Sequence, residues 1–212
     1  MTTHLLERPT RRAAESAGTI GPNAVIQTVN ALTELRGPGL CAQLLERIGK
    51  PWLLSYRPGA MIDEREFVEL YHDLLGALGR AETSRVMARA GMLTSQYVMR
   101  NRIPQPVHRL LRALPRQLGL RLLLGAIGKH AWTFAGSGKF GYTPGRTPLL
   151  TIERCLTARD QASDAPICSF YQAAFEGFVT TLIDPRLRVR EERCLACGAA
   201  RCEFRIVLEA MP

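Results

Sequence analysis

The C-terminal part of the chain carries a cysteine pattern that restricts its local fold to a hairpin. The motif combines one carboxylate with three thiols: Glu191, Cys194, Cys197 and Cys202. The flanking segments 187–192 and 202–208 alternate polar and apolar residues, which is typical of paired strands. Because Gly198 lets the connection fold back, we expect Cys194 and Cys202 to lie opposite each other on the two stems.

Thiols that meet at the turn of a hairpin beside a carboxylate are typical of a closed zinc site, which needs four ligands. Cys168, expected at the start of the last long helix, and Glu191 would complete a set begun by Cys194 and Cys202. Two other interpretations fit the same spacing. The thiols are buried and free, as cysteine often is, or Cys194 and Cys197 form a redox pair, although the strand-to-helix setting of a thioredoxin motif is absent.

The rest of the chain divides into three regions. Residues 1–17 hold three arginines and little periodicity, and we expect a flexible N-terminal arm. Residues 18–129 form the expected helical part, because apolar residues recur every three to four positions between glycine and proline breaks. The helices are expected over about 22–36, 40–48, 64–78, 81–99, 106–114 and 117–128.

Residues 130–212 form the expected small-molecule-binding part. Residues 132–135 and 149–155 are predicted strands, and Asp164 is expected to cap a helix that begins near Ala165. The segment 136–141 matches G-x-G-x-x-G, but turn residues follow it instead of a helix, so we predict a tight turn and no NAD(P) or flavin motif. The pattern predicts an α+β fold, with N-terminal helices packed on a small antiparallel β-sheet that ends in a zinc-binding hairpin.

The charge balance favours an anionic partner. Lys and Arg number 28 against 19 Asp and Glu, a net charge of +9, and no acidic residue lies between Glu82 and Glu153. The arginines are mixed with apolar residues and no helix-turn-helix pattern is evident, so we do not expect a nucleic-acid partner. No stretch approaches 18 uncharged apolar residues and the N-terminus lacks a secretory apolar region, which predicts a cytoplasmic protein with reduced thiols.

The C-terminal motif resembles that of the 4-vinyl-reductase domain family over residues 130–210. The family signature is Glu-x-x-Cys, then a glycine, then Cys-x-Phe, preceded by a cysteine that opens a helix. The resemblance implies a zinc ion held by three cysteines and one glutamate: Cys168, Glu191, Cys194 and Cys202. Cys197 is then an extra thiol outside the pattern. The segments Gly18-Thr-Ile-Gly-Pro-Asn-Ala-Val and Trp132-Thr-Phe-Ala-Gly-Ser-Gly-Lys-Phe extend the resemblance to bacteriochlorophyll-biosynthesis members, over residues 18–210.

The resemblance implies a tetrapyrrole ligand of the divinyl protochlorophyllide or Mg-porphyrin type and a link to 8-vinyl reduction. Zinc held by four protein ligands is structural, and vinyl reduction needs a hydride or electron source. We therefore expect a carrier or accessory factor that supports the reduction. The alternatives are the reductase itself, with electrons from an external donor, and a sensory or scaffold module of the kind found in aromatic-responsive bacterial regulators.

Candidate ligand-binding groups lie between residues 108 and 134. They offer arginines for a propionate, histidines for magnesium and aromatic rings for stacking: His108, Arg109, Arg112, Arg116, His130, Trp132 and Phe134. The plainer interpretation is a solvated basic face with core aromatics, and the same helices also suit anionic lipid at the photosynthetic inner membrane. Other pigment-biosynthesis enzymes and a second copy of the chain are further candidate partners.

Overall fold

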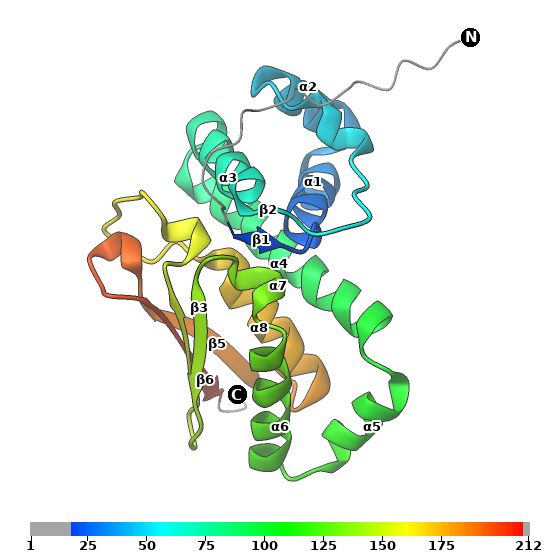
Figure 1. Cartoon of the computed structure of the whole chain (residues 1–212), viewed down its shortest axis with the longest axis vertical. Helices are drawn as coiled ribbons and strands as arrows, with labels where there is room; N and C mark the ends of the chain where they lie inside the picture. The colour runs from blue at the N-terminus through cyan, green and yellow to red at the C-terminus, as the bar shows by residue number, and fades with distance from the viewer. Residues whose placement is uncertain (1–17, 210–212) are drawn as a thin grey trace.

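The computed structural model describes residues 18–209 and shows an α+β fold (Figure 1). The expected arm, residues 1–17, lies outside the described residues. The helices are α1 Asn23–Arg36, α2 Pro38–Arg47, α3 Glu64–Leu78, α4 Arg80–Arg102, α5 Gln105–Ala113, α6 Arg116–Lys129, α7 Trp132–Ala135 and α8 Ser169–Leu182. The strands are β1 Thr19–Ile20, β2 Ile62–Asp63, β3 Lys139–Thr143, β4 Leu149–Glu153, β5 Leu187–Arg193 and β6 Cys202–Leu208. Within the described residues, no helix is long and apolar enough to cross a bilayer.

The boundaries of the N-terminal helices follow local signals. Pro22 precedes α1, and Gly37 and Gly79, with φ of 82° and 76°, separate α1 from α2 and α3 from α4. A positive φ is readily adopted by glycine alone, so each glycine ends one helix and redirects the chain. These breaks confirm the helices expected from the sequence to within a few residues.

Helix α4 connects the helical part to the rest of the molecule by packing along α8. The two helices approach closely through glycines. A Cβ atom on Gly91 would lie 2.1 Å from the carbonyl oxygen of Phe170, and one on Gly177 would lie 2.1 Å from Ser95 Oγ. Helices α1 and α3 pack on α4 and α2 packs on α1, while α8 and α6 pack against the sheet.

The larger sheet is antiparallel with strand order β3-β4-β6-β5. Its register pairs Phe140 with Ile152 and Leu150 with Phe204. The inward residues of β6, Cys202, Phe204 and Ile206, are buried, whereas those between them are partly exposed. This alternation confirms the predicted C-terminal hairpin, which is formed by β5 and β6.

One predicted strand and the predicted start of one helix were wrong. Residues 132–135 form the short helix α7 instead of a strand, because a turn at residues 130–131 follows α6 and Ala135 N donates to the carbonyl of Ala131. The first strand of the sheet begins later, at Lys139, so the tight turn predicted over 136–141 is confined to residues 136–138 and the rest of that segment belongs to β3. Helix α8 begins at Ser169, not near Ala165, and its N-cap is Cys168 instead of Asp164.

A buried carboxylate joins the two predicted parts of the chain. Glu64, at the start of α3, is 2% exposed. Its carboxylate accepts from Ser137 N at 2.6 Å, Ser137 Oγ at 2.7 Å and Arg159 Nη1 at 2.7 Å. Burial acts to raise the pKa of Glu64, but the hydrogen bonds from Arg159 and Ser137 outweigh it and lower the pKa below its usual value. Residues of both parts also share one hydrophobic core.

Candidate metal centre

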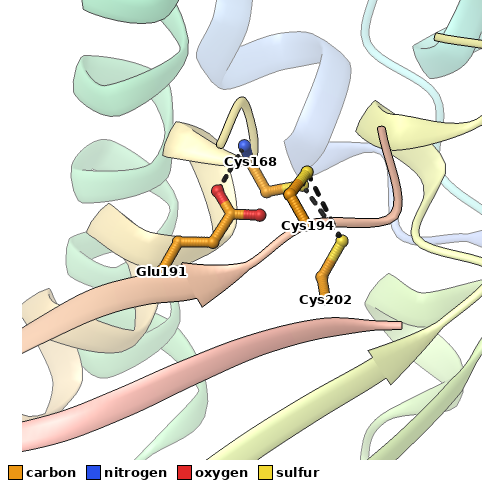
Figure 2. A group of neighbouring side chains, drawn as sticks. All are labelled: Cys168, Glu191, Cys194 and Cys202. Carbon is orange, nitrogen blue, oxygen red and sulfur yellow. Dashed lines mark hydrogen bonds between the residues drawn. The ribbon is translucent and has the colours of Figure 1, made fainter. Parts of the chain in front are cut away.

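Three segments bring a carboxylate and three thiols together at one corner of the sheet (Figure 2). Cys168 precedes α8, Glu191 lies near the end of β5, Cys194 directly follows β5, and Cys202 begins β6. One donor atom from each residue lies within 4.8 Å of the others. The four residues are those for which the sequence predicts metal binding, and Cys194 and Cys202 face each other across the hairpin.

The sulfur geometry fits a tetrahedral ion. The Sγ atom of Cys168 lies 3.4 Å from that of Cys202 and 3.8 Å from that of Cys194, and the Cys194 and Cys202 sulfurs are 3.9 Å apart. A tetrahedral ion with metal–sulfur bonds of about 2.3 Å places its sulfur ligands about 3.8 Å apart. The three thiols are therefore already spaced as ligands of a single ion.

Glu191 presents one oxygen that has no other partner. Its Oε2 accepts from Cys168 N at 2.7 Å, which orients the side chain. The backbone N of Glu191 donates to Gln172 Oε1 at 2.9 Å, which holds the backbone at this position. Its Oε1 is buried and has no hydrogen-bond partner among the described residues. Buried polar atoms are nearly always satisfied, so this oxygen is suited to a metal ion.

The electrostatics of the cluster also favour a cation. Burial and the neighbouring Cys194 raise the pKa of Glu191 to about 8. Burial and the adjacent thiols likewise raise the pKa of Cys168. Metal coordination requires deprotonated thiols and a carboxylate, and a bound cation supplies the charge that stabilises them.

The hairpin turn stabilises a negative charge on the Cys202 sulfur. Leu195 N donates to Cys202 Sγ at 3.3 Å, and Ala199 N donates to the carbonyl of Cys194 at 3.2 Å. Gly198 adopts a left-handed conformation with φ of 83°, which closes this turn. An amide that donates to sulfur stabilises a thiolate, so the turn orients and supports this ligand.

A fourth buried thiol, that of Cys155, lies beside the cluster and was not predicted from the sequence. It follows β4, and its Sγ lies 3.5 Å from Cys168 Sγ and 3.7 Å from Thr157 Oγ1. Arg154, with φ of 50°, turns the chain just before it. The only sequence signal for Cys155 is that the chain contains six cysteines. Its place beside the cluster depends on the pairing of β4 with β6, which no local sequence pattern predicts.

Cys197 lies apart from the donor group. Its side chain is exposed, and desolvation and the neighbouring Cys194 raise its pKa. A redox-active thiol needs a lowered pKa. The grouping of four donor atoms, which leaves out Cys197, favours a metal centre over the redox interpretation of Cys194 and Cys197.

The candidate ligand-binding residues are distributed between the interior and the surface. His108 is buried, with Nε2 3.1 Å from the carbonyl oxygen of Met99. Phe134 lies in an aromatic cluster with Phe140, Tyr171 and Phe175. Arg109, His130 and Trp132 are exposed.

Arg112 and Arg116 are brought together near the end of α8. Arg112 Nε donates to the carbonyl of Thr181 at 3.0 Å, and Arg116 lies 3.7 Å from Asp184. Two of the three candidate arginines thus have partners within the protein, whereas Arg109 has none among the described residues. No single site contains all seven candidates.

Comparison with known proteins identifies the family. Over 191 residues the chain is 40% identical to the bacteriochlorophyll synthase 23 kDa chain of Cereibacter sphaeroides, which covers 89% of this chain and 90% of that one. The chain belongs to the family of the bacteriochlorophyll synthase 23 kDa chain. The Rhodobacter capsulatus member is 32% identical over 185 residues, covering 87% of this chain and 85% of that one. Membership supports a role in bacteriochlorophyll biosynthesis.

The metal-centre region matches the model of the 4-vinyl-reductase (V-4-R) domain over residues 148–208. This range contains β4, α8, β5 and β6 and therefore all four candidate metal ligands. The match begins just before β4, so α7 and β3 lie outside it.

Solved structures share the fold. A protein from a study of heme distortion in the H-NOX family matches with a TM-score of 0.59 and 13% identity, over 91% of this chain and 97% of that one. The phenol-responsive sensory domain of the transcription activator PoxR, solved with phenol, matches with a TM-score of 0.51 and 14% identity, over 68% and 74%. At these identities the likeness shows the fold alone.

Proposed function

We propose that this protein binds a tetrapyrrole precursor of bacteriochlorophyll and acts as a carrier or accessory factor for 8-vinyl reduction. The observation that carries the proposal is the 40% identity, over nine-tenths of the chain, to a protein named as a chain of bacteriochlorophyll synthase. The shared fold adds support, because a neighbouring structure comes from a family studied for its heme. The fold therefore has a precedent for holding a macrocycle of this size.

A zinc ion is the proposed occupant of the metal centre. The ligands would be Cys168, Glu191, Cys194 and Cys202, whose sulfur spacing and unpartnered carboxylate oxygen suit a tetrahedral ion. Zinc with four protein ligands has no open position, so the ion contributes folding free energy and no redox chemistry. Elemental analysis of the purified protein tests this assignment, with one zinc per chain as the expected result.

We place the macrocycle at the α6–β3 seam, defined by Gly125, Gly128, Phe140 and Tyr142. Helix α6 packs on β3 here through glycines, and a Cβ on Gly128 would only touch Tyr142 and Phe140, at 3.7 and 3.8 Å. Aromatic side chains of β3 therefore lie directly against the glycines of α6, and a flat ligand would stack on this aromatic surface. His130 follows α6 at its border, where it is exposed and available to a magnesium ion.

The expected affinity suits a carrier. Burial of about 300 Å² of one macrocycle face at about 25 cal/mol per Å² contributes about 7 kcal/mol before costs. Loss of translational and rotational freedom removes at least about 4 kcal/mol of this, and opening the seam removes more. The balance is a weak to moderate affinity, which permits delivery of the pigment to another enzyme. We therefore propose that other pigment-biosynthesis enzymes receive the ligand.

Direct catalysis is the second candidate function, because the resemblance is to a family associated with vinyl reduction. The turn at Gly136–Gly138 leads into β3, so no helix begins there to bind a dinucleotide pyrophosphate. A reductase built on this chain would need an external electron donor.

Homodimer formation stays a prediction of the sequence.

Titration with divinyl protochlorophyllide separates the two functions. We expect the pigment absorption spectrum to shift on addition of the protein, with saturation at one pigment per chain. Addition of NADPH should leave the vinyl group unchanged. Conversion of vinyl to ethyl would instead identify an enzyme, and no spectral shift would contradict tetrapyrrole binding.

A variant of the seam tests the placement of the pigment. Gly128→Leu adds a branched side chain between α6 and β3 and should weaken pigment binding at least tenfold. The control is Gly39→Leu, because a Cβ at Gly39 meets no atom within 4 Å. Circular dichroism of both variants checks that the fold is retained. Equal pigment affinities of the two folded variants would contradict the placement.

A further inference from the structure

Exposed apolar side chains are concentrated in one short part of the chain. Of the nine large hydrophobic side chains that are exposed among the described residues, five lie between residues 107 and 132. They are Val107 at 39%, Leu110 at 55%, Leu118 at 45%, Leu122 at 48% and Trp132 at 59% exposure. Scattered exposed residues are normal, but a concentration of this kind marks an interaction surface.

Four of these residues lie on α5 and α6, which form a helical hairpin, and Trp132 begins α7 just after it. Helices α5 and α6 are joined by a short turn at the end of the molecule away from α2 and α3 (Figure 1). His108 and Leu111 of α5 point into the protein and are buried, while Val107 and Leu110 are exposed. On α6, Leu118 and Leu122 are four residues apart and therefore share an outer face.

Three exposed basic side chains on the same two helices lack acidic partners among the described residues. Arg109, Arg121 and Lys129 are exposed and take part in no ion pair among the described residues. No acidic residue occurs between Glu82 and Glu153, so the hairpin itself contributes no negative charge. Elsewhere, exposed arginines are often paired, as Arg89 is with Glu34 at 2.6 Å. The hairpin thus combines exposed apolar side chains with uncompensated positive charge.

We propose that the α5–α6 hairpin docks on the surface of an anionic lipid bilayer. Leucines would enter the boundary between headgroups and acyl chains, while the flanking arginines and lysine contact the lipid phosphates. Long basic side chains suit this position because their alkyl stems remain in apolar surroundings as their charges reach the headgroups. The proposal stands on these observations and does not depend on pigment binding.

Sedimentation with vesicles tests the proposal on the full chain without pigment. One set of vesicles contains equal parts of phosphatidylcholine and phosphatidylglycerol, and the other contains phosphatidylcholine alone. We expect binding to the anionic vesicles, a fall in binding with added salt, and at least tenfold weaker binding to the neutral vesicles. The salt series separates the electrostatic attraction from the insertion of apolar side chains, because salt weakens only the electrostatic attraction.

Matched variants identify the surface. Leu110→Ser with Leu118→Ser should weaken binding to anionic vesicles about tenfold or more. The control, Leu35→Ser with Leu40→Ser, removes leucines of α1 and α2 that are 48% and 55% exposed and should leave binding unchanged. Arg109→Gln with Arg121→Gln should weaken binding about twenty- to thirtyfold. Arg85→Gln, whose side chain is 79% exposed on α4, should have no such effect.

Several outcomes would overturn the proposal. They are absence of binding to anionic vesicles, equal binding to neutral vesicles, and equal losses in the hairpin and control variants. Capture of a protein partner by the hairpin with no vesicle binding would assign this surface to that partner. Because all substituted side chains are exposed, thermal unfolding should be unchanged and shows that the variants remain folded.

Discussion

The metal centre and the α5–α6 hairpin differ in how their residues are held. At the metal centre, segments distant in sequence converge on buried donor atoms, and backbone amides fix the orientation of Glu191 and Cys202. On the hairpin, the functional candidates are exposed, and their positions follow from helical periodicity alone. The comparison indicates that substitutions at the first region change the fold, whereas those at the second change only binding.

The largest effect is expected at the metal centre. Cys202→Ala should remove the bound zinc and lower the free energy of unfolding by more than about 5 kcal/mol, because structural zinc binding is folding free energy. Elemental analysis and thermal unfolding measure the two losses. Cys197→Ala is the control and should keep both values near those of the unaltered protein, since Cys197 is exposed. A stable, soluble Cys202→Ala protein would contradict the expectation that substitutions at the metal centre, unlike those on the hairpin, change the fold.

The buried Glu64 extends the comparison to a second fixed polar cluster. Glu64→Gln should lower the free energy of unfolding by about 3 kcal/mol, because it breaks a buried ion pair with Arg159. Glu34→Gln, which breaks an exposed pair with Arg89, should cost less than about 1 kcal/mol. Chemical denaturation measures both changes. Equal losses would show that burial of the pair is not what stabilises it.

The pH dependence of the Glu64 contribution has a definite sign. The pKa of Glu64 in the folded protein is lowered, so its stabilisation is fully present above the pKa of the unfolded chain. It is lost as the pH falls through the lower, folded pKa. The difference in unfolding free energy between the unaltered protein and Glu64→Gln should therefore shrink in acid, as measured by denaturation at a series of pH values. A difference that grows in acid would contradict the assigned direction.

A smaller effect is expected at Cys155, which borders the centre without belonging to the four-donor group. Its thiol contacts Cys168 Sγ, so Cys155→Ala should weaken zinc binding about tenfold, as loss of a group that supports a ligand commonly does. Competition with a chelator measures the affinity. Cys41→Ala, on α2, should leave it unchanged. Complete loss of zinc from Cys155→Ala would instead make Cys155 a ligand.

The smallest effect on stability is expected on the hairpin. Leu110→Ser should change the free energy of unfolding by no more than about 0.5 kcal/mol, since the side chain is 55% exposed. The neighbouring Leu111, at 6% exposure, provides the contrast, and Leu111→Ser should cost at least about 2 kcal/mol. Thermal unfolding of the two variants compares them directly. Similar losses would show that the outer face of α5 is part of the core.

Much of the fold and of the candidate site was predictable from the sequence. Glycines at positions 37 and 79 end helices by their own conformational freedom, and alternation in 202–208 identifies a strand. The four proposed metal ligands were predicted from a motif and a family resemblance, and the structure brings them together. Helical periodicity likewise predicted α5 and α6 to within a few residues.

Tertiary packing decided the rest. The four residues 132–135 are too few to distinguish a strand from a helical turn, and they form a helical turn after the chain turns at residues 130–131. Helix α8 starts at Ser169, where Glu191 from β5 accepts the amide of the preceding Cys168, a contact that no local signal encodes. Cys155 joins the metal cluster through sheet pairing, and His108 turns inward against Met99. Periodicity and turn chemistry act within a few residues, whereas burial and convergence depend on contacts between segments far apart in the chain.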